Sequence, residues 1–445
     1  MPDPDSSTAD RFCIIGAGSS GLAAAKNFRE AGIPFDCLER EDDVGGNWYY
    51  GKPASSVYAS THLISSKTLT EYVDFPMPEE YPEYPSHRQA FEYLRAYADR
   101  FCLRERIEFN TSVERAVPLG DAGAGWLVRL ADGRERRYRG VVIANGHNWD
   151  PRFPDCPGEF TGEALHSCQY KTPDAMRGKR VLVVGGGNSG CDLACEAAIH
   201  ADAAIQSRRR NYHVLPKFFR GKPIDQCNEL VLWLRLPLWL RRLAGSVVEH
   251  VVHGPAWRTG VPQPDHPLFS THPVINSQIH HHVGHGRLAL RPDVKRFAGR
   301  RVEFVDGTTD EVDLVIYATG FKATIPFVEP DVLCWRDGAP RLFLNVFHPT
   351  RNDLFVIGLI QPDSGQWGLV DHQARLAARY LNAVQRASLK RAPAGLARFE
   401  KARAANAWNP GGGVRYLDSP RHLLEVEHYG YRRQLQRWIK RLANV

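Results

Sequence analysis

The chain of 445 residues lacks several features that would point to whole classes of protein. Its nine cysteines are scattered and form no C-x-x-C pair, so a disulfide framework, a structural zinc site and a thioredoxin-type dithiol have little support. Arginines and a proline interrupt the longest apolar stretch, residues 230–243, which falls short of the roughly 20 apolar residues that span a bilayer. The first ten residues are polar and acidic and provide no apolar core for a secretory signal. We therefore expect a cytoplasmic protein.

Charge and histidine content exclude further classes. The chain has 57 Lys and Arg against 50 Asp and Glu, a surplus of 7 positive charges, and no long basic run of the kind that binds nucleic acid. The histidine-rich stretch 279–285 lacks a second cluster of ligand residues, so no metal site is predicted. Hydrophobic residues at 43% and charged residues at 24% are typical of an ordinary globular protein, long enough here for two domains.

Two glycine-rich turns are the most informative features that the chain does have. GAGSSG at 16–21 follows an apolar strand and precedes a helix, with a further strand expected at 35–39. GGGNSG at 185–190 follows another apolar strand, with a helix expected at 191–200 and a strand at 203–207. In such a β-α-β unit, glycine lets the backbone approach a pyrophosphate, and the helix N-terminus stabilises the anion. The sequence therefore predicts two dinucleotide sites.

The repeated unit predicts the fold class. We expect an α/β protein with two Rossmann-like dinucleotide-binding domains, of which the second is inserted in the first. Apolar strands at 141–144 and 314–318 each lead to glycine and suggest where the chain leaves the first domain and returns to it. The first domain would then consist of residues 1–169 and 323–445, the latter including C-terminal helices. The inserted domain would occupy 170–322, with a helical insertion at about 225–285.

The residues that end the strand after each turn predict which nucleotide the turn binds. Glu39 ends the first of these strands, where a carboxylate accepts hydrogen bonds from ribose hydroxyls and repels a 2′-phosphate, so the first turn suits FAD. Ser207-Arg208-Arg209 ends the second, where guanidinium groups pair with the 2′-phosphate of NADPH. The alternatives are a turn that serves only helix packing at the first site and a solvated basic loop at the second.

Between the two turns lies an eleven-residue pattern, F-x-G-x-x-x-H-x-x-x-Y, from Phe160 to Tyr170. With this pattern and the turns on either side of it, the chain resembles the flavin-containing monooxygenases over most of its length. The resemblance implies that NADPH reduces FAD and that the reduced flavin takes up O2 as a C4a-hydroperoxyflavin, which oxygenates nitrogen or sulfur of a small lipophilic substrate. Because the cofactor carries this chemistry, no catalytic triad is expected, and no catalytic side chain is assigned.

The resemblance and the positions of the turns together assign residues to each cofactor. The predicted FAD-binding residues are Gly16, Gly18, Ser19, Gly21, Glu39, Arg40, Gly46, Asn47, Trp48 and Gln366. The predicted NADP-binding residues are Gly185, Gly187, Asn188, Ser189, Gly190, Ser207, Arg208, Arg209 and Thr319. By resemblance, His166 lies in a linker and supports cofactor binding or domain closure rather than proton transfer. Tyr170 followed by Lys171 resembles the branch that oxygenates amines and sulfides more than the Baeyer-Villiger branch, which usually has Trp there.

One position departs from the resemblance. Many members of the family carry an asparagine three residues before the lysine that matches Lys67, where its amide can contact flavin and nicotinamide, whereas this chain has Ile64. The polar contribution is then absent or comes from a nearby side chain, the candidates being His62, Ser65 and Ser66. We expect either more leakage of electrons to hydrogen peroxide or a different substrate chemistry.

Several alternatives stay open. The same frame suits a Baeyer-Villiger or an oxidative-decarboxylating monooxygenase, and a different class would be an FAD-dependent reductase or a redox-binding protein. The amphipathic, basic stretch 230–242 favours a helical flap over the substrate entrance, with peripheral membrane contact as the less favoured alternative. The expected partners are a small-molecule substrate and O2 and not nucleic acid; an oligomer is compatible with the sequence.

Overall fold

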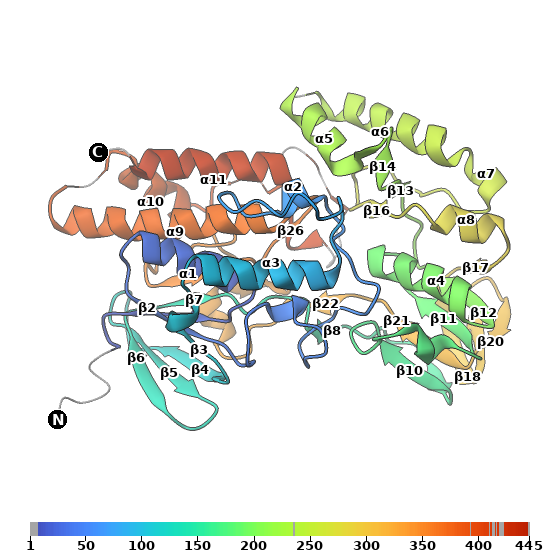
Figure 1. The fold of residues 1–445 in the computed structure, drawn as a ribbon, viewed down its shortest axis with the longest axis horizontal. Coiled ribbons are helices and arrows are strands. Elements are labelled where there is room, and N and C mark those ends of the chain that lie inside the picture. Colours follow the sequence, from blue (N-terminus) through green and yellow to red (C-terminus); the bar gives the residue numbers. More distant parts are fainter. Residues whose placement is uncertain are drawn as a thin grey trace.

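Two five-stranded parallel sheets form the frame of the protein in a computed structural model (Figure 1). The structure describes residues 8–443 apart from 235, 392, 409, 412–413, 415 and 418–421. The first seven residues of the polar N-terminal segment, and Arg235 of the amphipathic stretch, therefore lie outside the described residues. The predicted fold class, an α/β protein with two dinucleotide-binding folds, is confirmed by these sheets.

The first sheet combines strands from both ends of the chain. Its order is β25 (Leu354–Val356), β7 (Gly140–Ile143), β1 (Phe12–Ile15), β2 (Phe35–Leu38), β3 (Ile107–Glu108). Both faces are covered, which explains why β1 is apolar throughout. Phe12 and Ile14 pack with α1 (Ser19–Glu30), α3 (His87–Arg100), α9 (Trp367–Ser388), α10 (Leu396–Ala404) and α11 (His428–Ala443). Cys13 and Ile15 face the small sheet of β4 (Val113–Pro118), β5 (Trp126–Leu130) and β6 (Glu135–Tyr138).

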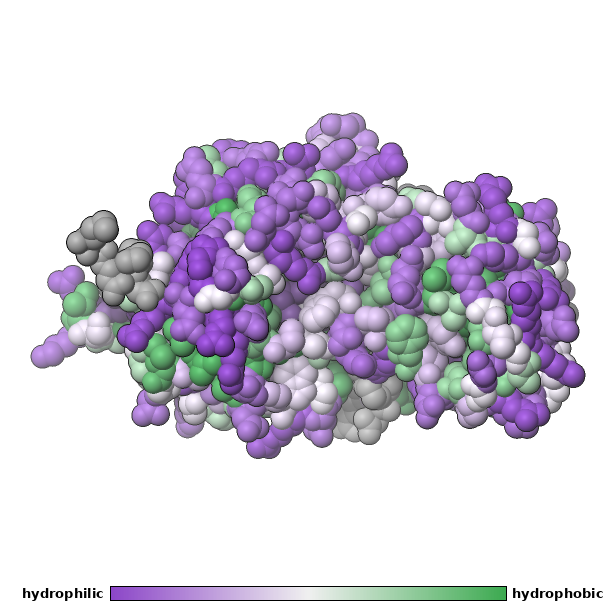
Figure 2. Space-filling view, turned by 90° about the horizontal axis from the view of Figure 1, so that it is seen from below, coloured by the Kyte–Doolittle hydropathy of each residue, from purple (hydrophilic) through white to green (hydrophobic). Residues whose placement is uncertain are grey.

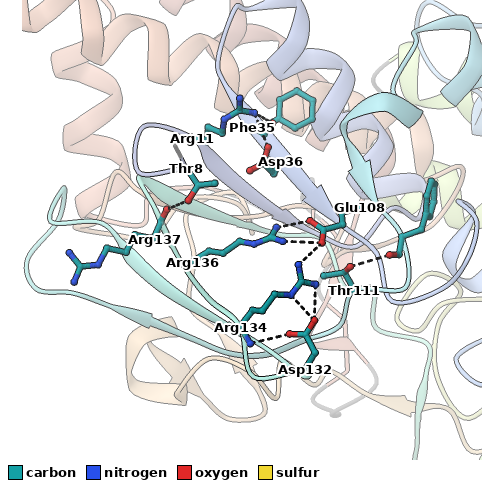
Figure 3. A network of polar contacts seen from close by, with 11 residues as sticks. Thr8, Arg11, Phe35, Asp36, Glu108, Thr111, Asp132, Arg134, Arg136 and Arg137 are labelled. Atoms are coloured by element: carbon teal, nitrogen blue, oxygen red, sulfur yellow. Dashed lines mark hydrogen bonds and ion pairs between the residues drawn. The ribbon is translucent and has the colours of Figure 1, made fainter. Parts of the chain in front are cut away.

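An ion-pair network holds the small sheet against the end of the first one (Figure 3). Glu108 of β3 accepts hydrogen bonds from Arg136 at 2.6 and 2.9 Å and from Arg134 at 3.3 Å. The backbone of Glu39 joins the same edge, since its N–H donates to Glu108 O at 3.0 Å and its carbonyl accepts from Thr111 at 2.8 Å. The network therefore fixes the backbone around Glu39.

The second sheet has the order β10 (Glu163–His166), β21 (Leu314–Tyr317), β11 (Arg180–Val184), β12 (Ala203–Ser207), β17 (Leu288–Arg291), with α4 (Asn188–His200) after β11. Beside it lies a four-stranded sheet of β20 (Thr309–Glu311), β19 (Arg301–Phe304), β18 (Val294–Gly299) and β9 (Gly158–Phe160). Both β9 and β10 precede residue 170, yet they pair with strands of the later segment. We therefore propose that the inserted domain begins near residue 157 rather than at residue 170.

The helical insertion lies at the top of the molecule in Figure 1 and consists mainly of α5 (Ile224–Trp233), α6 (Leu238–His253), α7 (Ala256–Thr259) and α8 (Ile279–Gly284). Glu229 of α5 accepts hydrogen bonds from His428 and Arg432 of α11, which attaches the insertion to the first domain. Asp225, at the start of α5, accepts a hydrogen bond from Ser66 N at 2.6 Å, so this end of the insertion contacts the loop that follows residue 64.

The outer face of the insertion is apolar. Large exposed side chains there are Leu230, Trp233, Leu234, Trp239, Leu243, Val247, Val251 and Val252. Figure 2 shows the molecule from below the view of Figure 1, and hydrophilic residues predominate on that face. Across the described ranges, no helix is both long enough and apolar enough to cross a membrane.

Short elements complete the chain. These are η2 (Gly46–Trp48), α2 (Lys67–Thr70), η3 (Arg104–Arg106), β8 (Asp150–Pro151), η4 (Pro173–Met176), β13 (Val214–Leu215), β14 (Phe218–Phe219), β15 (Lys222–Pro223), β16 (Val274–Ile275), β22 (Phe321–Lys322), η5 (Pro330–Leu333), β23 (Trp335–Arg336), β24 (Ala339–Pro340), β26 (Gln361–Pro362) and β27 (Glu425–Val426). The pair β8 and β22 connects the two halves where the chain leaves the first sheet and where it returns.

Candidate functional site

A single cleft of about 1030 Å³ brings both glycine turns together. This volume is at the upper end of what one drug-sized ligand occupies, so the cleft has room for large nucleotide ligands. The predicted FAD residues that line it are Gly16, Gly18, Ser19, Glu39, Arg40, Gly46, Asn47, Trp48 and Gln366. The predicted NADP residues that line it are Gly185, Gly187, Asn188, Ser189, Ser207, Arg209 and Thr319. His62, Ile64 and Ser65 line it as well, whereas Gly21, Gly190, Arg208, Ser66, His166 and Tyr170 are not among the lining residues.

The first turn has the geometry of an anion cradle. A Cβ on Gly21 would lie 1.7 Å from the carbonyl oxygen of Gly16, so only glycine lets α1 pack this closely against the turn. Gly18 is the N-cap of α1 and has no side chain that could cap the helix. The N–H groups of the first helical turn are therefore left to a ligand, and the pyrophosphate of a dinucleotide fits that need.

Glu39 is held in one orientation at the end of β2. Its Oε2 accepts a hydrogen bond from Ala17 N at 2.6 Å, and its Oε1 accepts from Glu41 N at 3.0 Å. Burial raises the pKa of the Glu39 carboxyl above its usual range, and these two N–H donors oppose that shift. The carboxylate still has lone pairs free to accept from ribose hydroxyls, the role predicted for it.

The other predicted FAD residues are fixed by their neighbours. Asn47 Oδ1 accepts from the backbone and hydroxyl of Ser56, and the ring of Trp48 stands edge-on to Trp367 with centroids 5.8 Å apart. Gln366 Nε2 donates to the carbonyl oxygens of Gly358 and Ile360 at 3.1 and 3.0 Å. These contacts leave the residues little freedom at the cleft wall and would hold a bound flavin in a defined position.

The second turn repeats the construction of the first. A Cβ on Gly190 would lie 2.2 Å from Gly185 O, and Gly187 is the N-cap of α4 without a side chain. Asn188 Oδ1 accepts from Ile275 N at 2.9 Å, which ties the start of α4 to the insertion. The hydroxyl of Thr319, after β21, donates to Arg152 O. A second dinucleotide therefore fits this turn for the same reasons as the first.

Of the three arginines after β12, the two predicted to bind the 2′-phosphate, Arg208 and Arg209, differ in where their side chains lie. Arg208 is 5% exposed, and its Nε and Nη2 donate to Gln206 Oε1 at 3.0 and 2.7 Å. Gln206 in turn donates to Gly185 O at 2.8 Å, so Arg208 supports the turn from behind. Arg209 is the one of the pair that lines the cleft. This arrangement favours Arg209, and not Arg208, as the residue that contacts a 2′-phosphate.

The end of the eleven-residue pattern, together with Lys171, makes contacts with both domains. His166 is buried, its Nε2 lies 3.1 Å from Gly320 O, and burial lowers its pKa. Tyr170 packs its ring against Tyr58 with centroids 5.6 Å apart. Lys171 Nζ donates to the carbonyl oxygens of Ser55 and Val57 at 2.8 and 3.1 Å. Tyr170 and Lys171 thus contact residues 55–58 of the first domain. His166, in contrast, ends β10, pairs with Tyr317 of β21 and lies in the second sheet rather than in a linker between the domains.

The polar candidates around Ile64 differ in what they can still do. The hydroxyl of Thr70 donates to Ser66 O at 2.9 Å, so Ser65 Oγ, 2.7 Å from Thr70 Oγ1, must be the donor of that bond. Ser66 Oγ is buried and has no hydrogen-bond partner among the residues that the structure describes. His62 lines the cleft and contacts Lys217. Among His62, Ser65 and Ser66, the side chain of His62 is therefore the strongest polar candidate at the part of the cleft wall that includes Ile64.

One residue at this wall, Asp192, and one residue that contacts the wall from behind, Lys217, were missed from the sequence. Asp192, early in α4, lines the cleft and accepts from Asn276 Nδ2 at 2.7 Å. Lys217, which precedes β14 and the helical insertion, contacts His62. Asp192 could have been suspected, because it follows the second turn by two residues. Lys217 gives no such signal, since 25 residues separate it from Asp192 and only folding brings them together.

Comparisons with known proteins agree with this geometry. A family model described as flavin-binding monooxygenase-like matches residues 9–393. A Homo sapiens protein whose name reads "Putative dimethylaniline monooxygenase 6", N-oxide-forming, is 34% identical over 392 residues, covering 83% of this chain and 72% of that protein. An Arabidopsis thaliana protein whose name reads "Probable indole-3-pyruvate monooxygenase YUCCA9" is 35% identical over 326 residues, covering 70% of this chain and 75% of that protein.

The fold is also found among solved structures. The open crystal structure of cyclohexanone monooxygenase superposes with a TM-score of 0.71 at 19% identity and covers 97% of each chain. At this identity the likeness shows a shared fold. It supports the arrangement of two dinucleotide-binding units around one cleft.

Proposed function

Because this chain belongs to the family of flavin-binding monooxygenases and is an FAD- and NADPH-dependent monooxygenase, we propose that it oxygenates nitrogen or sulfur of a small lipophilic molecule. The observation that carries the proposal is the cleft, which places both turns and the loop around Ile64 on one continuous surface. The name of the human relative and the pair Tyr170-Lys171 favour amines and sulfides over ketones. Nine free cysteines support the further proposal of a reducing, cytoplasmic location.

The side chains have a supporting role in this chemistry. FAD, when bound, supplies the activation of O2, and NADPH supplies the hydride. The first turn and Glu39 would bind the adenosine diphosphate end of FAD, while Trp48 and Gln366 would orient the rest of the molecule. The second turn and Arg209 would bind NADPH, and α5 with the loop at Ser66 would keep water out.

Substrate profiling tests the proposal. We expect NADPH consumption, after subtraction of the hydrogen peroxide released, to match product formation with tertiary amines or thioethers. With cyclic ketones and 2-oxo acids we expect NADPH consumption to yield hydrogen peroxide and little product. Matched turnover with ketones alone would assign Baeyer-Villiger chemistry, and matched turnover with 2-oxo acids alone would assign oxidative decarboxylation. Reduction of a dithiol or protein partner without oxygen uptake would indicate the reductase class.

Arg209→Ala is expected to raise the KM for NADPH about tenfold and to leave the KM for NADH nearly unchanged, because only NADPH carries the phosphate that a guanidinium binds through charge-assisted hydrogen bonds. Steady-state kinetics with both nucleotides measures the two constants. Arg210→Ala is the matched control, since Arg210 lies on the same loop, is not among the lining residues and pairs with Asp265 at 3.8 Å. If Arg209→Ala changed the KM for NADPH and the KM for NADH by the same factor, Arg209 would not be the residue that binds the 2′-phosphate.

Ile64→Asn is expected to lower the hydrogen peroxide released per NADPH consumed about threefold, because an amide would add a hydrogen-bond donor where the wall is now apolar. Peroxide yield and NADPH consumption are measured in the same reaction. Ile64→Leu, which keeps the wall apolar at equal volume, should behave like the natural enzyme. An unchanged peroxide yield in Ile64→Asn would mean that residue 64 does not face the reacting atoms.

A further inference from the structure

Helix α6 has the reverse of the usual distribution of polar and apolar side chains. Four large apolar residues at every fourth position, Trp239, Leu243, Val247 and Val251, are between 53% and 67% exposed. Residues four apart lie on one side of a helix, so these side chains form a single stripe over roughly 18 Å of its length. A helix on the surface of a globular protein normally turns such a stripe toward the core. The stripe on α6 points to solvent instead.

The opposite side of α6 is polar and packs against the protein. Arg242 Nε donates to Leu268 O at 2.9 Å, and the buried guanidinium of Arg241 lies 5.5 Å from the centre of the Phe269 ring. Gly245 lies on the same side, where a Cβ would be 2.4 Å from the side chain of Leu268, so the helix and this loop are in close contact. These contacts hold α6 with its apolar stripe outward.

The carboxylates of α5 and α6 are turned toward the protein as well. Residues 224–253 contain three of them, Asp225, Glu229 and Glu249. Asp225 and Glu229 accept hydrogen bonds from the first domain at 2.6 Å each, and Glu249 accepts from Val214 N at 3.1 Å. Among the residues that the structure describes, the outward sides of both helices therefore carry no negative charge.

Helix α5, which precedes α6 along the top of the molecule in Figure 1, extends the apolar surface. Leu230, Trp233 and Leu234 at its end are more than half exposed, and their spacing places them on one side of the helix. Together with the stripe on α6 they form what we call the outer face. The exposed Arg220 and Lys222 stand just before α5 in the chain. An exposed apolar surface of this extent marks an interaction site.

Two occupants could cover the outer face, a second copy of the chain or a lipid bilayer, and charge distinguishes them. Two copies paired through this face would meet without a carboxylate from either α5 or α6 to balance the basic groups nearby. A bilayer with anionic headgroups supplies the missing negative charge, and the surplus of 7 positive charges on the chain favours the same partner. Trp233 and Trp239 are of the residue type that concentrates between headgroups and acyl chains.

We propose that the outer face docks on a lipid bilayer that carries anionic headgroups. Helix α6 would lie parallel to the bilayer surface, with its stripe at the boundary between headgroups and acyl chains. The sequence pattern favours a flap over the substrate entrance, whereas the outward direction of the stripe favours the membrane alternative. This inference goes beyond the proposed oxygenation of nitrogen or sulfur and does not depend on it.

Flotation of the FAD-loaded enzyme with lipid vesicles tests the inference. We expect the natural chain to bind vesicles of phosphatidylcholine with about 30% phosphatidylglycerol at least about fivefold more tightly than vesicles of phosphatidylcholine alone. The double variant Trp239→Gln/Leu243→Gln should lower the partition coefficient on the anionic vesicles at least about tenfold, because two large apolar side chains are removed from the bound face.

Two matched comparisons separate the outer face from general stickiness. Ile199→Gln/Leu389→Gln removes two apolar side chains that are also more than half exposed but lie outside the insertion, and it should bind like the natural chain. On anionic vesicles, Val251→Glu should bind about fivefold more weakly than Val251→Gln, because it adds a negative charge to the face. Raising the salt concentration should shrink that difference.

NADPH oxidation without vesicles, flavin absorbance and melting temperature should stay unchanged in each variant, since the exchanged side chains are exposed. Failure of the natural chain to float, or an unchanged partition coefficient in Trp239→Gln/Leu243→Gln, would overturn the inference. Equal binding to both kinds of vesicle would overturn the role of anionic headgroups. A dimer in light scattering that this variant dissociates, without vesicle binding, would assign the outer face to a second copy of the chain and also overturn it.

Discussion

Replacing Gly21 by alanine is expected to give a protein that retains almost no FAD. The added methyl group would lie 1.7 Å from the carbonyl oxygen of Gly16 and 2.8 Å from its carbonyl carbon. Both atoms are backbone, and Gly16 is itself confined because its own Cβ position would lie 2.8 Å from Ala144 O. The start of α1 must therefore move away from the turn, which removes the N–H groups from the pyrophosphate. We expect the affinity for FAD to fall on the order of a hundredfold.

The ratio of flavin to protein absorbance after purification measures this loss. Gly284→Ala is the matched control, because Gly284 ends α8 and a Cβ there meets nothing within 4 Å. That variant should keep a full complement of FAD. If Gly21→Ala also retained stoichiometric FAD with an unchanged dissociation constant, the first turn would not be the flavin site, whatever the stability of the variant.

The parts of the fold that follow from local pattern were predictable from the sequence. Each turn was placed between a fully apolar strand and a helix, and the structure has β1 with α1 and β11 with α4 at those positions. The reason is that a strand buried on both faces must be apolar throughout and that a tight turn into a helix needs glycine. Such constraints act within about 30 residues, so a single sequence reveals them.

Features set by long-range pairing were less predictable. Strands β9 and β10 have polar, exposed residues, and their membership in the second half depends on partners in β18 and β21, far along the chain. Likewise, nothing local distinguishes Arg208 from Arg209. The distinction comes from Gln206, whose side chain accepts from Arg208 and draws it inward. The boundary proposed near residue 157 and the proposed role of Arg209 therefore depend on contacts that a local sequence pattern does not reveal.

Replacing Gly190 by alanine is expected to have the complementary effect, namely a yellow, folded protein that NADPH reduces at least about a hundredfold more slowly. The methyl group would lie 2.2 Å from Gly185 O, whose own position is limited by Ala318 O at 2.3 Å from the Gly185 Cβ site. The clash is therefore of the same kind as the clash at Gly21, but it occurs at the turn that follows a strand of the second sheet. Because the first turn and Glu39 belong to a different sheet, FAD binding should persist.

Anaerobic mixing with NADPH, followed by the loss of flavin absorbance, measures the rate of reduction in Gly190→Ala. Dithionite should reduce the same sample fully, since it needs no nucleotide site. A normal rate with NADPH would contradict the assignment of the second turn, and loss of FAD would contradict the independence of the two sites. With Gly21→Ala, the pair of variants separates flavin retention from hydride delivery. Such a separation is expected because the two turns have the same construction but belong to different sheets that face one cleft. In this reaction, electrons enter at the second turn, from NADPH, and leave at the first, from the flavin.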